Sequence, residues 1–462
     1  MNEAQRAVYD AIIAEALPIT TATAADESRS KVFFIDSEGG GGKTFLLETV
    51  IAAVREESKV AIACATTGVA ALLLEGGTTA HSRFGVPVPA EQKSISDIVK
   101  ESARAQVIKE AAVIVWDEIT QAHKYVVNTV PFGGKVVVFS GDFKQCLPVV
   151  PHGSDDDAFA ASVQTLNFWN NHVRRYQLNV NERIRRLMLA GQDTAEFVEW
   201  AQFLLDVGHG RGACADEVSI PVTARATATS LEGLVREVYD NFDGPTDFVT
   251  RAVLAPRNVQ VDEANDIAIR LFPGTAITRY SRDSLDPEYA DTSCPLEVLN
   301  SINPPDFPPH RLVLKEQMPV MLLRNLNLGA GLSNGTRLKV IDARQHVIKT
   351  EILTGPRTGE IAFIPRIMLD SKKENSPFVF QRQQFPLRPA FALTINKAQG
   401  QTFERVGLDV TLECFSHGQL YVALSRVGHP SRLRVLAKDL DRVRNVVCRQ
   451  IHHAVVQLDA EA

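Results

Sequence analysis

The stretch SEGGGGKT, from Ser37 to Thr44, joins glycines to a lysine and a threonine between the apolar runs KVFFID and FLLETV. At the end of a strand pattern and the start of a helix pattern, this composition indicates a phosphate-binding loop, because backbone N–H groups and a helix N-terminus can surround phosphate oxygens. Lys43 would contact the β and γ phosphates of ATP, and the Thr44 hydroxyl would bind Mg²⁺. A flexible glycine-rich turn, the alternative, does not explain Lys and Thr at this junction. The residues expected around the nucleotide are Gly39, Gly40, Gly41, Gly42, Lys43 and Thr44.

The first two residues of this loop differ from the usual pattern. Ser37 stands where such loops begin with glycine, and Glu38 adds a carboxylate close to the expected triphosphate. Serine is a mild change because it is small. A Glu38 side chain that points into the site would oppose ATP binding electrostatically, whereas one that points to solvent would not, and the sequence leaves both open.

Two further strand patterns end in polar residues that suit ATP hydrolysis. AAVIVWDEIT ends in adjacent acids, of which Asp117 would hold Mg²⁺ through water and Glu118 would polarise the attacking water. VVVFSGDFKQCLP ends in Gly141, Asp142 and Gln145, and Gln145 would sense the γ-phosphate or orient the water. Each pattern alone would also suit an ordinary strand end or a polar turn. Beside the glycine-rich loop in one sheet, they predict an ATP-hydrolysing site.

Composition sets the class of protein but not its partner. The chain has 462 residues, 45% of them hydrophobic, which predicts two to four domains with large cores. A formal net charge of -6 gives no overall attraction to nucleic acid, so a DNA-binding surface would have to be a local basic groove. The six cysteines lie singly, without the spacing of a zinc or redox motif, and are expected to be reduced. We find neither a long apolar run nor a signal-peptide pattern, so we expect an intracellular protein without a membrane partner.

The order of strand-like and helix-like segments predicts an α/β protein with a β-rich insert. Residues 31–150 alternate short apolar strand patterns with helix-prone segments, as in a parallel sheet covered by helices. The run RAVLAPRNVQVDEANDIAIRLF predicts a strand, turn and helix of a second such unit. The proline-rich NPPDFPPH, from Asn303 to His310, predicts a stiff linker, and Leu17–Ser30 predicts a loop. The expected domains are 1–167 (with a small DNA-contacting insert near 75–110), 168–310, a β-rich insert 311–385, and 386–462 as the remainder of the second domain.

Several motifs in order along the chain carry a specific family resemblance. They are SEGGGGKT, ATTGVAALLLEGGTTAHSRF, VIVWDEITQAHK, GDFKQCLPVVP, LNVNERIR, PVMLLRN, TINKAQGQTF and YVALSR. Together they resemble the PIF (petite integration frequency) family of superfamily-one DNA helicases, from Gln5 to about Arg432. Within this family, three stretches are most similar to the branch that Helitron transposons encode: AALLLEGGTTAHSRFGVP, PFGGKVVVFSGDFKQ and LNSINPPDFPPHRLVLK.

The resemblance implies an ATP-dependent helicase that moves 5′ to 3′ along single-stranded DNA and separates forked duplexes or G-quadruplexes. Its fold would be two RecA-like P-loop NTPase domains, with a small SH3-like β-barrel insert in the second. By their motifs, Gln5 would read adenine, Gly400 would border the nucleotide, and Arg183 and Arg426 would reach the γ-phosphate from the second domain. The family also implies work in DNA replication, repair, recombination, transposition or telomere maintenance, in the nucleus or alternatively the mitochondrion. We expect a monomer, with a dimer on DNA as the alternative.

The resemblance also implies a DNA track on both domains. ATTG and TAHSRF would offer hydroxyls and backbone amides to phosphates and rings to bases, while TINKAQGQT and NGT would hold the same strand. Contacts of this kind follow the backbone, so little sequence preference is expected. A set of ordinary polar loops is the alternative. The residues concerned are Thr66, Thr67, His81, Arg83, Phe84, Asn334, Thr336, Thr394, Asn396, Lys397 and Gln399.

Two features depart from the family pattern. Gly41 replaces a usual threonine, leaving four consecutive glycines with more entropy to lose on ordering. The segment from His123 to Pro131 is shorter than in the family and leaves little room for a full covering helix over the sheet. Two rival hypotheses therefore accompany the helicase: a degenerate transposon-derived remnant that binds single-stranded DNA without ATP turnover, and a P-loop ATPase that acts on a partner other than nucleic acid.

Overall fold

The computed structural model places the chain in two compact units. It describes residues 1–18, 30–130, 132–150, 153–242, 248, 250–286, 294–304, 307–371 and 379–451. The first unit comprises Met1–Ser219, Cys414–Ser425 and the residues from Asp441 onward. The second comprises Ile220–Glu413 and Arg426–Leu440.

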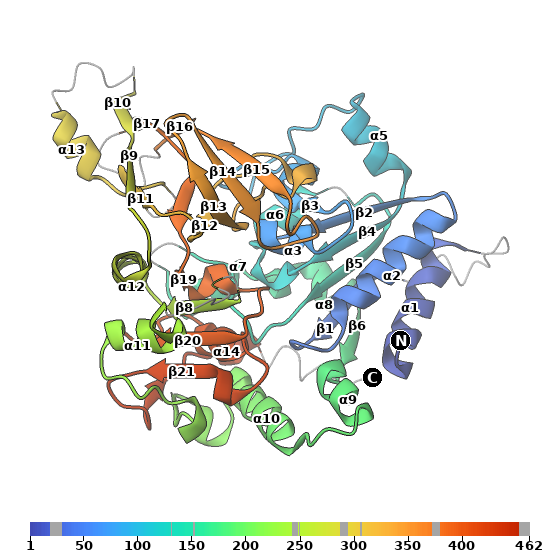
Figure 1. Ribbon diagram of the computed structural model, residues 1–462. Coiled ribbons are helices and arrows are strands. Elements are labelled where there is room, and N and C mark those ends of the chain that lie inside the picture. The colour runs from blue at the N-terminus through green and yellow to red at the C-terminus, as the bar shows by residue number, and fades with distance from the viewer. Residues whose placement is uncertain are drawn as a thin grey trace. The chain divides into compact units, whose positions relative to one another are not determined.

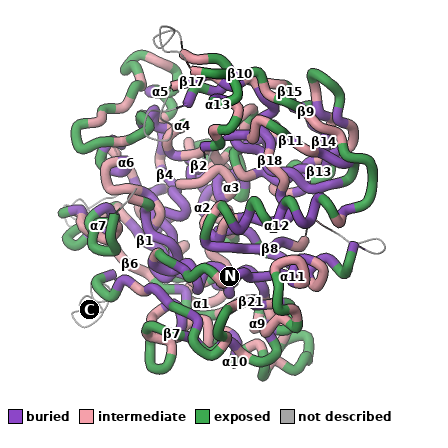
Figure 2. Tube along the Cα trace, turned by 90° about the vertical axis from the view of Figure 1, so that its left-hand side faces the viewer, coloured by how far each residue is buried: buried purple, intermediate pink, exposed green. Residues whose placement is uncertain are grey.

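A six-stranded parallel sheet forms the centre of the first unit, in the order β3-β2-β4-β5-β1-β6. Strands rich in Val, Ile and Phe can be buried on both faces, and Figure 2 shows β1 and β4 as largely buried. This sheet confirms the α/β pattern predicted for residues 31–150. Its strands are β1 (Val32–Ser37), β2 (Val60–Ala65), β3 (Thr78–Thr79), β4 (Ala111–Asp117), β5 (Val136–Gly141) and β6 (Val173–Leu178).

Helices cover both faces of this sheet. On one face α1 (Glu3–Ala16) and α2 (Lys43–Glu56) lie side by side (Figure 1) and bury Ile12 and Val50 against the strands. On the other face an aromatic core gathers around Trp116, which also packs on Phe139 at 6.1 Å between ring centroids. Burying such large rings is a main source of the unit's stability. The remaining helices of the unit are α3 (Gly68–Leu72), α4 (Ala80–Phe84), α5 (Ala103–Glu110), α6 (Lys124–Thr129), α7 (Asp155–Ala161), α8 (Asn167–His172), α9 (Glu182–Leu189), α10 (Ala195–His209) and α14 (Gln419–Leu424).

The shortened segment after β4 still builds a helix. The 3₁₀ turn η1 (Ile119–Gln121) leads into α6, whose Val126 and Val127 are buried in the aromatic core. Six residues suffice because the two valines are adjacent and both reach the sheet. This six-residue helix is compatible with the prediction that the segment leaves little room for a full covering helix; Pro131 lies outside the described residues.

The first unit extends beyond the predicted boundary at 167/168. Strand β6 pairs in parallel with β1 over Val173–Leu178, which places this segment in the first sheet. Two short strands, β7 (Glu217–Val218) and β22 (Val443–Arg444), pair antiparallel and bring a C-terminal segment into the same unit. The predicted 386–462 segment is consequently divided between the units. Strand pairing between distant segments caused both differences, and local sequence patterns do not report it.

The second unit contains a four-stranded parallel sheet in the order β19-β8-β20-β21. Its β8 (Arg251–Ala255) is followed by α12 (Asn258–Leu271), so the predicted strand-turn-helix is confirmed. The neighbouring α11 (Leu231–Val238) packs on α12 and on β20. The other strands are β19 (Ala392–Thr394), β20 (Arg405–Asp409) and β21 (Leu433–Leu436).

Antiparallel strands form the β-rich part of this unit. Its five-stranded sheet has the order β15-β14-β13-β12-β18, and smaller sheets pair β10-β17-β16 and β11-β9. The predicted β-rich insert is present, but strands before residue 311 and after residue 385 also belong to it. The elements are β9 (Ile277–Tyr280), β10 (Arg282–Leu285), α13 (Leu296–Ser301), β11 (Arg311–Leu314), β12 (Pro319–Leu322), β13 (Arg337–Ala343), β14 (Val347–Ile352), β15 (Ile361–Pro365), β16 (Ile367–Asp370), β17 (Phe380–Gln384) and β18 (Leu387–Pro389).

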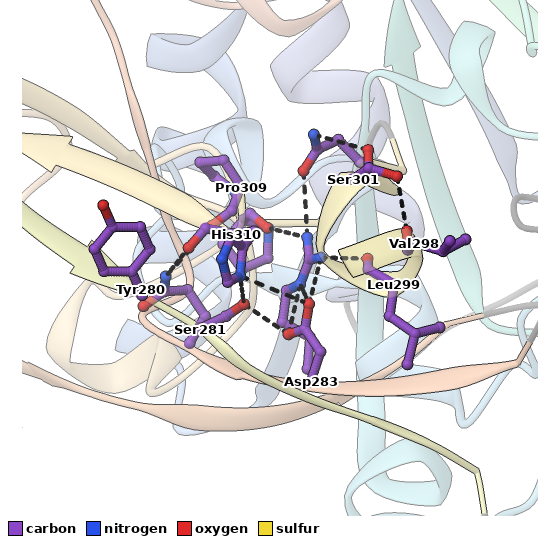
Figure 3. A network of polar contacts seen from close by, with 12 residues as sticks. Tyr280, Ser281, Asp283, Val298, Leu299, Ser301, Pro309 and His310 are labelled. Atoms are coloured by element: carbon purple, nitrogen blue, oxygen red, sulfur yellow. Dashed lines mark hydrogen bonds and ion pairs between the residues drawn. The ribbon is translucent and has the colours of Figure 1, made fainter. Parts of the chain in front are cut away.

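A buried ion pair joins β10 to β17 (Figure 3). Arg382 of β17 donates to both oxygens of Asp283 on β10, at 2.7 Å from Nη2 to Oδ2 and 3.0 Å from Nε to Oδ1, and both side chains are fully buried. The same guanidinium donates to the carbonyls of Leu299 and Pro308. Phe307 packs on Phe380, so the described part of the predicted proline-rich linker is part of this core rather than a spacer. Pro305 and Asp306, and residues 19–29 of the predicted N-terminal loop, lie outside the described residues.

Candidate nucleotide site

The glycine-rich loop connects the end of β1 to the start of α2, as its sequence predicts. Gly40 and Gly42 adopt positive φ angles of 95° and 79°, a backbone region that glycine enters without the steric cost of a Cβ atom. Gly42 is the N-cap of α2, and Lys43 is its first residue. The loop thus has the backbone that a phosphate-binding turn requires.

Two of the unusual loop residues fit each other sterically. A Cβ atom built on Gly41 would lie 2.2 Å from the Ser37 Oγ, far inside van der Waals contact. Ser37 is buried, and its hydroxyl donates to the Glu38 carbonyl at 3.2 Å. The missing side chain at Gly41 therefore makes room for the hydroxyl of Ser37.

Lys43 lies between the two acids predicted to serve hydrolysis. Its Nζ is 3.6 Å from the Asp117 Oδ1 and 3.7 Å from the Glu118 Oε1. Burial alone would lower the pKa of Lys43, but the Glu118 and Asp117 carboxylates raise it above its ordinary value. Burial raises the pKa of Glu118, which suits a group that polarises water or accepts a proton. The structure thus brings the predicted lysine and both predicted acids together.

Asp117 is oriented by contacts that all involve one carboxylate oxygen. Its Oδ1 accepts from the Ser140 hydroxyl at 2.6 Å and from the Glu118 N–H at 2.9 Å, and the same atom faces Lys43. The second oxygen can therefore hold a water ligand of Mg²⁺, which fits the predicted metal role of Asp117 with Thr44. Sequence reasoning did not identify Ser140, although the sequence places it two residues before Asp142 on the adjacent strand.

The N-terminal helix and the NERIR motif contact the loop. Gln5 is buried and its Nε2 donates to the Gly41 carbonyl at 3.2 Å, which places the predicted adenine-reading glutamine beside the loop. The Glu182 N–H donates to the Gly40 carbonyl at 3.0 Å. The next residue, Arg183, is exposed on α9 of the first unit, so its prediction as an arginine of the second domain is wrong. Pairing of β6 with β1 places this motif next to the loop.

The GDFKQ segment after β5 forms a second group of charges. Asp142 is fully buried, and its carboxylate accepts from the Gln145 Nε2 at 3.3 Å. Lys144 Nζ lies 3.0 Å from the Asp142 Oδ1 and 3.8 Å from the Glu38 Oε1. Glu38 is therefore held in an ion pair, an orientation that the sequence left open. Burial raises the pKa of Glu38, while Lys144 opposes this rise.

The predicted residues near the C-terminus belong to the second unit. Arg426 is buried, and its Nη1 donates to the Gln401 carbonyl at 3.0 Å. Gly400, with a φ of 77°, forms the turn before Gln401. Arg426 thus lies in the unit that the sequence predicted.

Five residues of the first unit were predicted to contact DNA, and four of them are polar residues in loops or short helices. Thr66 Oγ1 accepts from the Trp116 Nε1, and the Thr67 hydroxyl caps α3. His81 is partly buried, and Arg83 donates from Nε to the Thr78 hydroxyl. The fifth, Phe84, is fully buried and lies 5.9 Å from the Trp116 ring, so its predicted role in base stacking is wrong. It helps to close the aromatic core instead.

In the second unit, the predicted DNA contacts also divide by exposure. Asn334 is exposed, whereas Thr336 is fully buried and donates to the Gly331 carbonyl at 3.0 Å. Thr336 therefore stabilises a turn, and its hydroxyl does not reach solvent. Gln399 is also buried, with 5% of its surface exposed. Around the 3₁₀ helix Ile395–Ala398, Thr394, Asn396 and Lys397 are partly exposed.

None of the helices in the described part of the chain combines the length and the apolar composition that spanning a bilayer would require. The six cysteines are free thiols.

Two sequence families match this chain. The family described as PIF1-like helicase matches residues 1–218, and the family described as DNA helicase Pif1, 2B domain, matches residues 297–342. These are two different family models, and neither of them alone covers half of the chain. The ATP-dependent DNA helicase PIF1 of Xenopus laevis is 27% identical over 446 residues, which are 92% of this chain and 62% of that protein. The chain spans about three fifths of the length of the curated relatives that it matches first.

Solved structures share the fold. The Pif1 helicase of Bacteroides in complex with ADP-AlF3 and single-stranded DNA has a TM-score of 0.67, with 20% identity and coverage of 100% of this chain and 96% of that chain. The Pif1 helicase of Candida albicans has a TM-score of 0.64, with 22% identity and 99% coverage of both chains. The predicted α/β fold with two RecA-like units is therefore confirmed.

Proposed function

We propose that this chain is an ATP-dependent DNA helicase of the PIF1-like family. The observation that carries the proposal is the position of Lys43, at the end of a glycine-rich loop and within 4 Å of two acids at the end of β4. A phosphate-binding lysine beside two acidic residues is the arrangement that ATP hydrolysis requires.

The roles of the individual residues follow from this geometry. The loop amides and Lys43 would bind the phosphates, and Asp117 with Thr44 would hold Mg²⁺, which compensates phosphate charge. Glu118, whose pKa burial raises, would polarise the attacking water. Gln145 and Arg426 remain the proposed sensors of the γ-phosphate, since an arginine can stabilise the charge of the transferred phosphoryl group.

Single-stranded DNA is the proposed track, with movement from 5′ to 3′. In support, the Bacteroides Pif1 helicase was solved in complex with single-stranded DNA. Another similar structure describes DNA unwinding at forked duplex DNA by two coordinating Pif1 helicases. On this chain the partly exposed residues Thr394, Asn396 and Lys397 are suited to backbone phosphates. The exposed Asn334 and the polar loops around Thr66 would extend the same track.

Narrower assignments also belong to this proposal. The motif sequences support an origin in the Helitron branch. The family resemblance supports G-quadruplex substrates and an SH3-like form of the β-rich insert. It also supports work in DNA repair, recombination or telomere maintenance, in the nucleus or alternatively the mitochondrion. Activity as a monomer, or as a dimer on DNA, has the same support.

A catalytically inactive, DNA-binding remnant is the second hypothesis, because Glu38 places an additional carboxylate next to the loop. Two observations favour activity over this alternative. Lys144 pairs with Glu38, and Ser37 is accommodated by Gly41. The loop departures are thus matched by their surroundings.

The deciding experiment is steady-state ATP hydrolysis by purified protein with and without single-stranded oligonucleotide. Stimulation by DNA is expected, and Lys43→Ala or Glu118→Gln should abolish hydrolysis while DNA binding persists, since losing such a group typically costs about 10²-fold or more. Lys59→Ala, at an exposed lysine after the same helix, is the matched control. Binding without hydrolysis by the wild type would support the remnant, and hydrolysis that DNA does not stimulate would support a partner other than nucleic acid.

A further inference from the structure

Lys144 is a buried lysine that three carboxylates surround. Its side chain is 5% exposed, with Nζ at 3.0 Å from Asp142 and 3.8 Å from Glu38. Burial alone would lower the pKa of Lys144, but Asp142, Asp36 and Glu38 raise it, so the ammonium group stays charged. A buried charge is tolerated only with such partners, which means that Lys144 and these acids depend on each other.

Asp142 connects this lysine to the C-terminal segment of the first unit. The Tyr421 hydroxyl donates to the Asp142 Oδ2 at 2.9 Å, while the Lys144 N–H donates to the Oδ1 at 3.1 Å. Tyr421 is buried on α14. A Cβ atom on Gly208 of α10 would lie 2.9 Å from both the Lys144 Cδ and the Tyr421 Cδ2, so α10 packs tightly on the two side chains.

Helix α14 leads directly to the proposed arginine of the hydrolysis reaction. The Ser425 N–H donates to the Tyr421 carbonyl at 2.9 Å and closes the last turn of the helix. The chain enters the second unit at the next residue, Arg426. A change at Asp142 can therefore reach Arg426 through one hydrogen bond and one helical turn.

We propose that Lys144 and Tyr421 are positioning residues, which link the loop that binds nucleotide to the segment that carries Arg426. Lys144 holds the Glu38 carboxylate in an ion pair beside the loop and holds Asp142 for the Tyr421 hydroxyl. This inference rests on the proposed ATPase function. It assigns a purpose to Glu38, which the phosphate-binding role alone leaves unexplained.

Lys144 and Tyr421, at the two ends of this network, should affect different measured quantities: nucleotide affinity and kcat, respectively. Lys144 acts at the loop, so Lys144→Met should weaken nucleotide binding about tenfold, because an unpaired Glu38 charge then faces the phosphates. Tyr421 acts through α14, so Tyr421→Phe should leave nucleotide affinity within about twofold and lower kcat about tenfold, the effect of losing a hydrogen bond to a charged group.

The first experiment measures binding of a fluorescent ATP analogue and needs no turnover. Glu38→Gln should tighten binding in the Lys144→Met background by at least about threefold more than in the wild type, because Lys144 no longer directs the carboxylate. Lys144→Arg should retain wild-type affinity, and thermal melting of each variant excludes unfolding as the cause. Equal effects of Glu38→Gln in the two backgrounds, or unchanged affinity in Lys144→Met, would overturn the role of Lys144.

The second experiment compares DNA-stimulated hydrolysis by the wild type and Tyr421→Phe, with Tyr125→Phe on α6 as a control for loss of a tyrosine hydroxyl. A fall in kcat at constant KM supports the proposal. A wild-type rate in Tyr421→Phe would overturn it while leaving the helicase proposal intact. Failure of the wild type to hydrolyse ATP would instead contradict the proposed function, and the binding experiment would still decide the role of Lys144.

Discussion

The fit between Ser37 and Gly41 leads to a prediction that requires no knowledge of the reaction. Gly41 does not have a positive φ angle, so alanine is compatible with its backbone, and the only contact under 3 Å for a new Cβ atom is the Ser37 Oγ at 2.2 Å. Moving this hydroxyl disrupts its 3.2 Å hydrogen bond to the Glu38 carbonyl, which is worth about 0.5–1.5 kcal/mol. Overpacking of a buried site costs about 1–3 kcal/mol. We therefore expect Gly41→Ala to lower the free energy of unfolding by about 1–3 kcal/mol.

The assay is urea denaturation of four proteins: wild type, Gly41→Ala, Ser37→Gly and the double variant. Ser37→Gly removes the hydroxyl, so adding Gly41→Ala to that variant should lower the free energy of unfolding only slightly. The coupling energy between the two substitutions should therefore equal most of the loss seen for Gly41→Ala alone. Gly39→Ala is the matched control, because Gly39 is exposed and no atom lies within 4 Å of its would-be Cβ. Its effect should stay within about 0.5 kcal/mol. Equal losses at Gly39 and Gly41, or a Gly41→Ala loss that persists without the Ser37 hydroxyl, would refute the steric argument.

Substitutions at four other residues test the proposed reaction, the DNA contacts and the buried polar groups of the fold. Arg426→Ala should lower kcat by roughly 10³-fold or more with little change in nucleotide affinity, and an unchanged kcat would place Arg426 outside the reaction. Lys397→Ala should weaken binding to oligonucleotides of different sequence equally and reduce the salt slope by about one unit, whereas altered sequence preference would indicate base contacts. Burial lowers the pKa of His417 below 6.5, so the folded protein favours the neutral imidazole. The free energy of unfolding should therefore fall as the pH drops below about 6.5. His417→Gln should reduce this pH dependence, whereas His346→Gln, at an exposed site, should not. Arg382→Met should destabilise the protein by about 3–5 kcal/mol in urea denaturation, because it leaves a buried carboxylate without its partner, and a loss below about 1 kcal/mol would contradict this role.

The loop and the acidic strand ends could be predicted from the sequence because their information is local. SEGGGGKT has glycines where β1 turns into α2, and a run of apolar residues before Asp117 and Glu118 indicates a buried strand with its acids at one end. Parallel strands place such ends at one edge of the sheet, so Lys43 was expected beside the acids, and the distances of 3.6 and 3.7 Å agree. The order of motifs along the chain was sufficient to indicate the family resemblance.

Only the tertiary structure decided which of the remaining residues reach the site. Phe84 and Thr336 lie in motifs with suitable chemistry, but packing buries both of them. Arg183 belongs to the first unit because β6 pairs with β1 across more than a hundred residues of chain. The direction of Glu38 depends on Lys144, which is also more than a hundred residues away in the sequence. The physical reason is the same in these cases. Backbone conformation follows largely from neighbouring residue types, whereas burial, strand pairing and the direction of a charged side chain depend on groups that only the folded chain brings together.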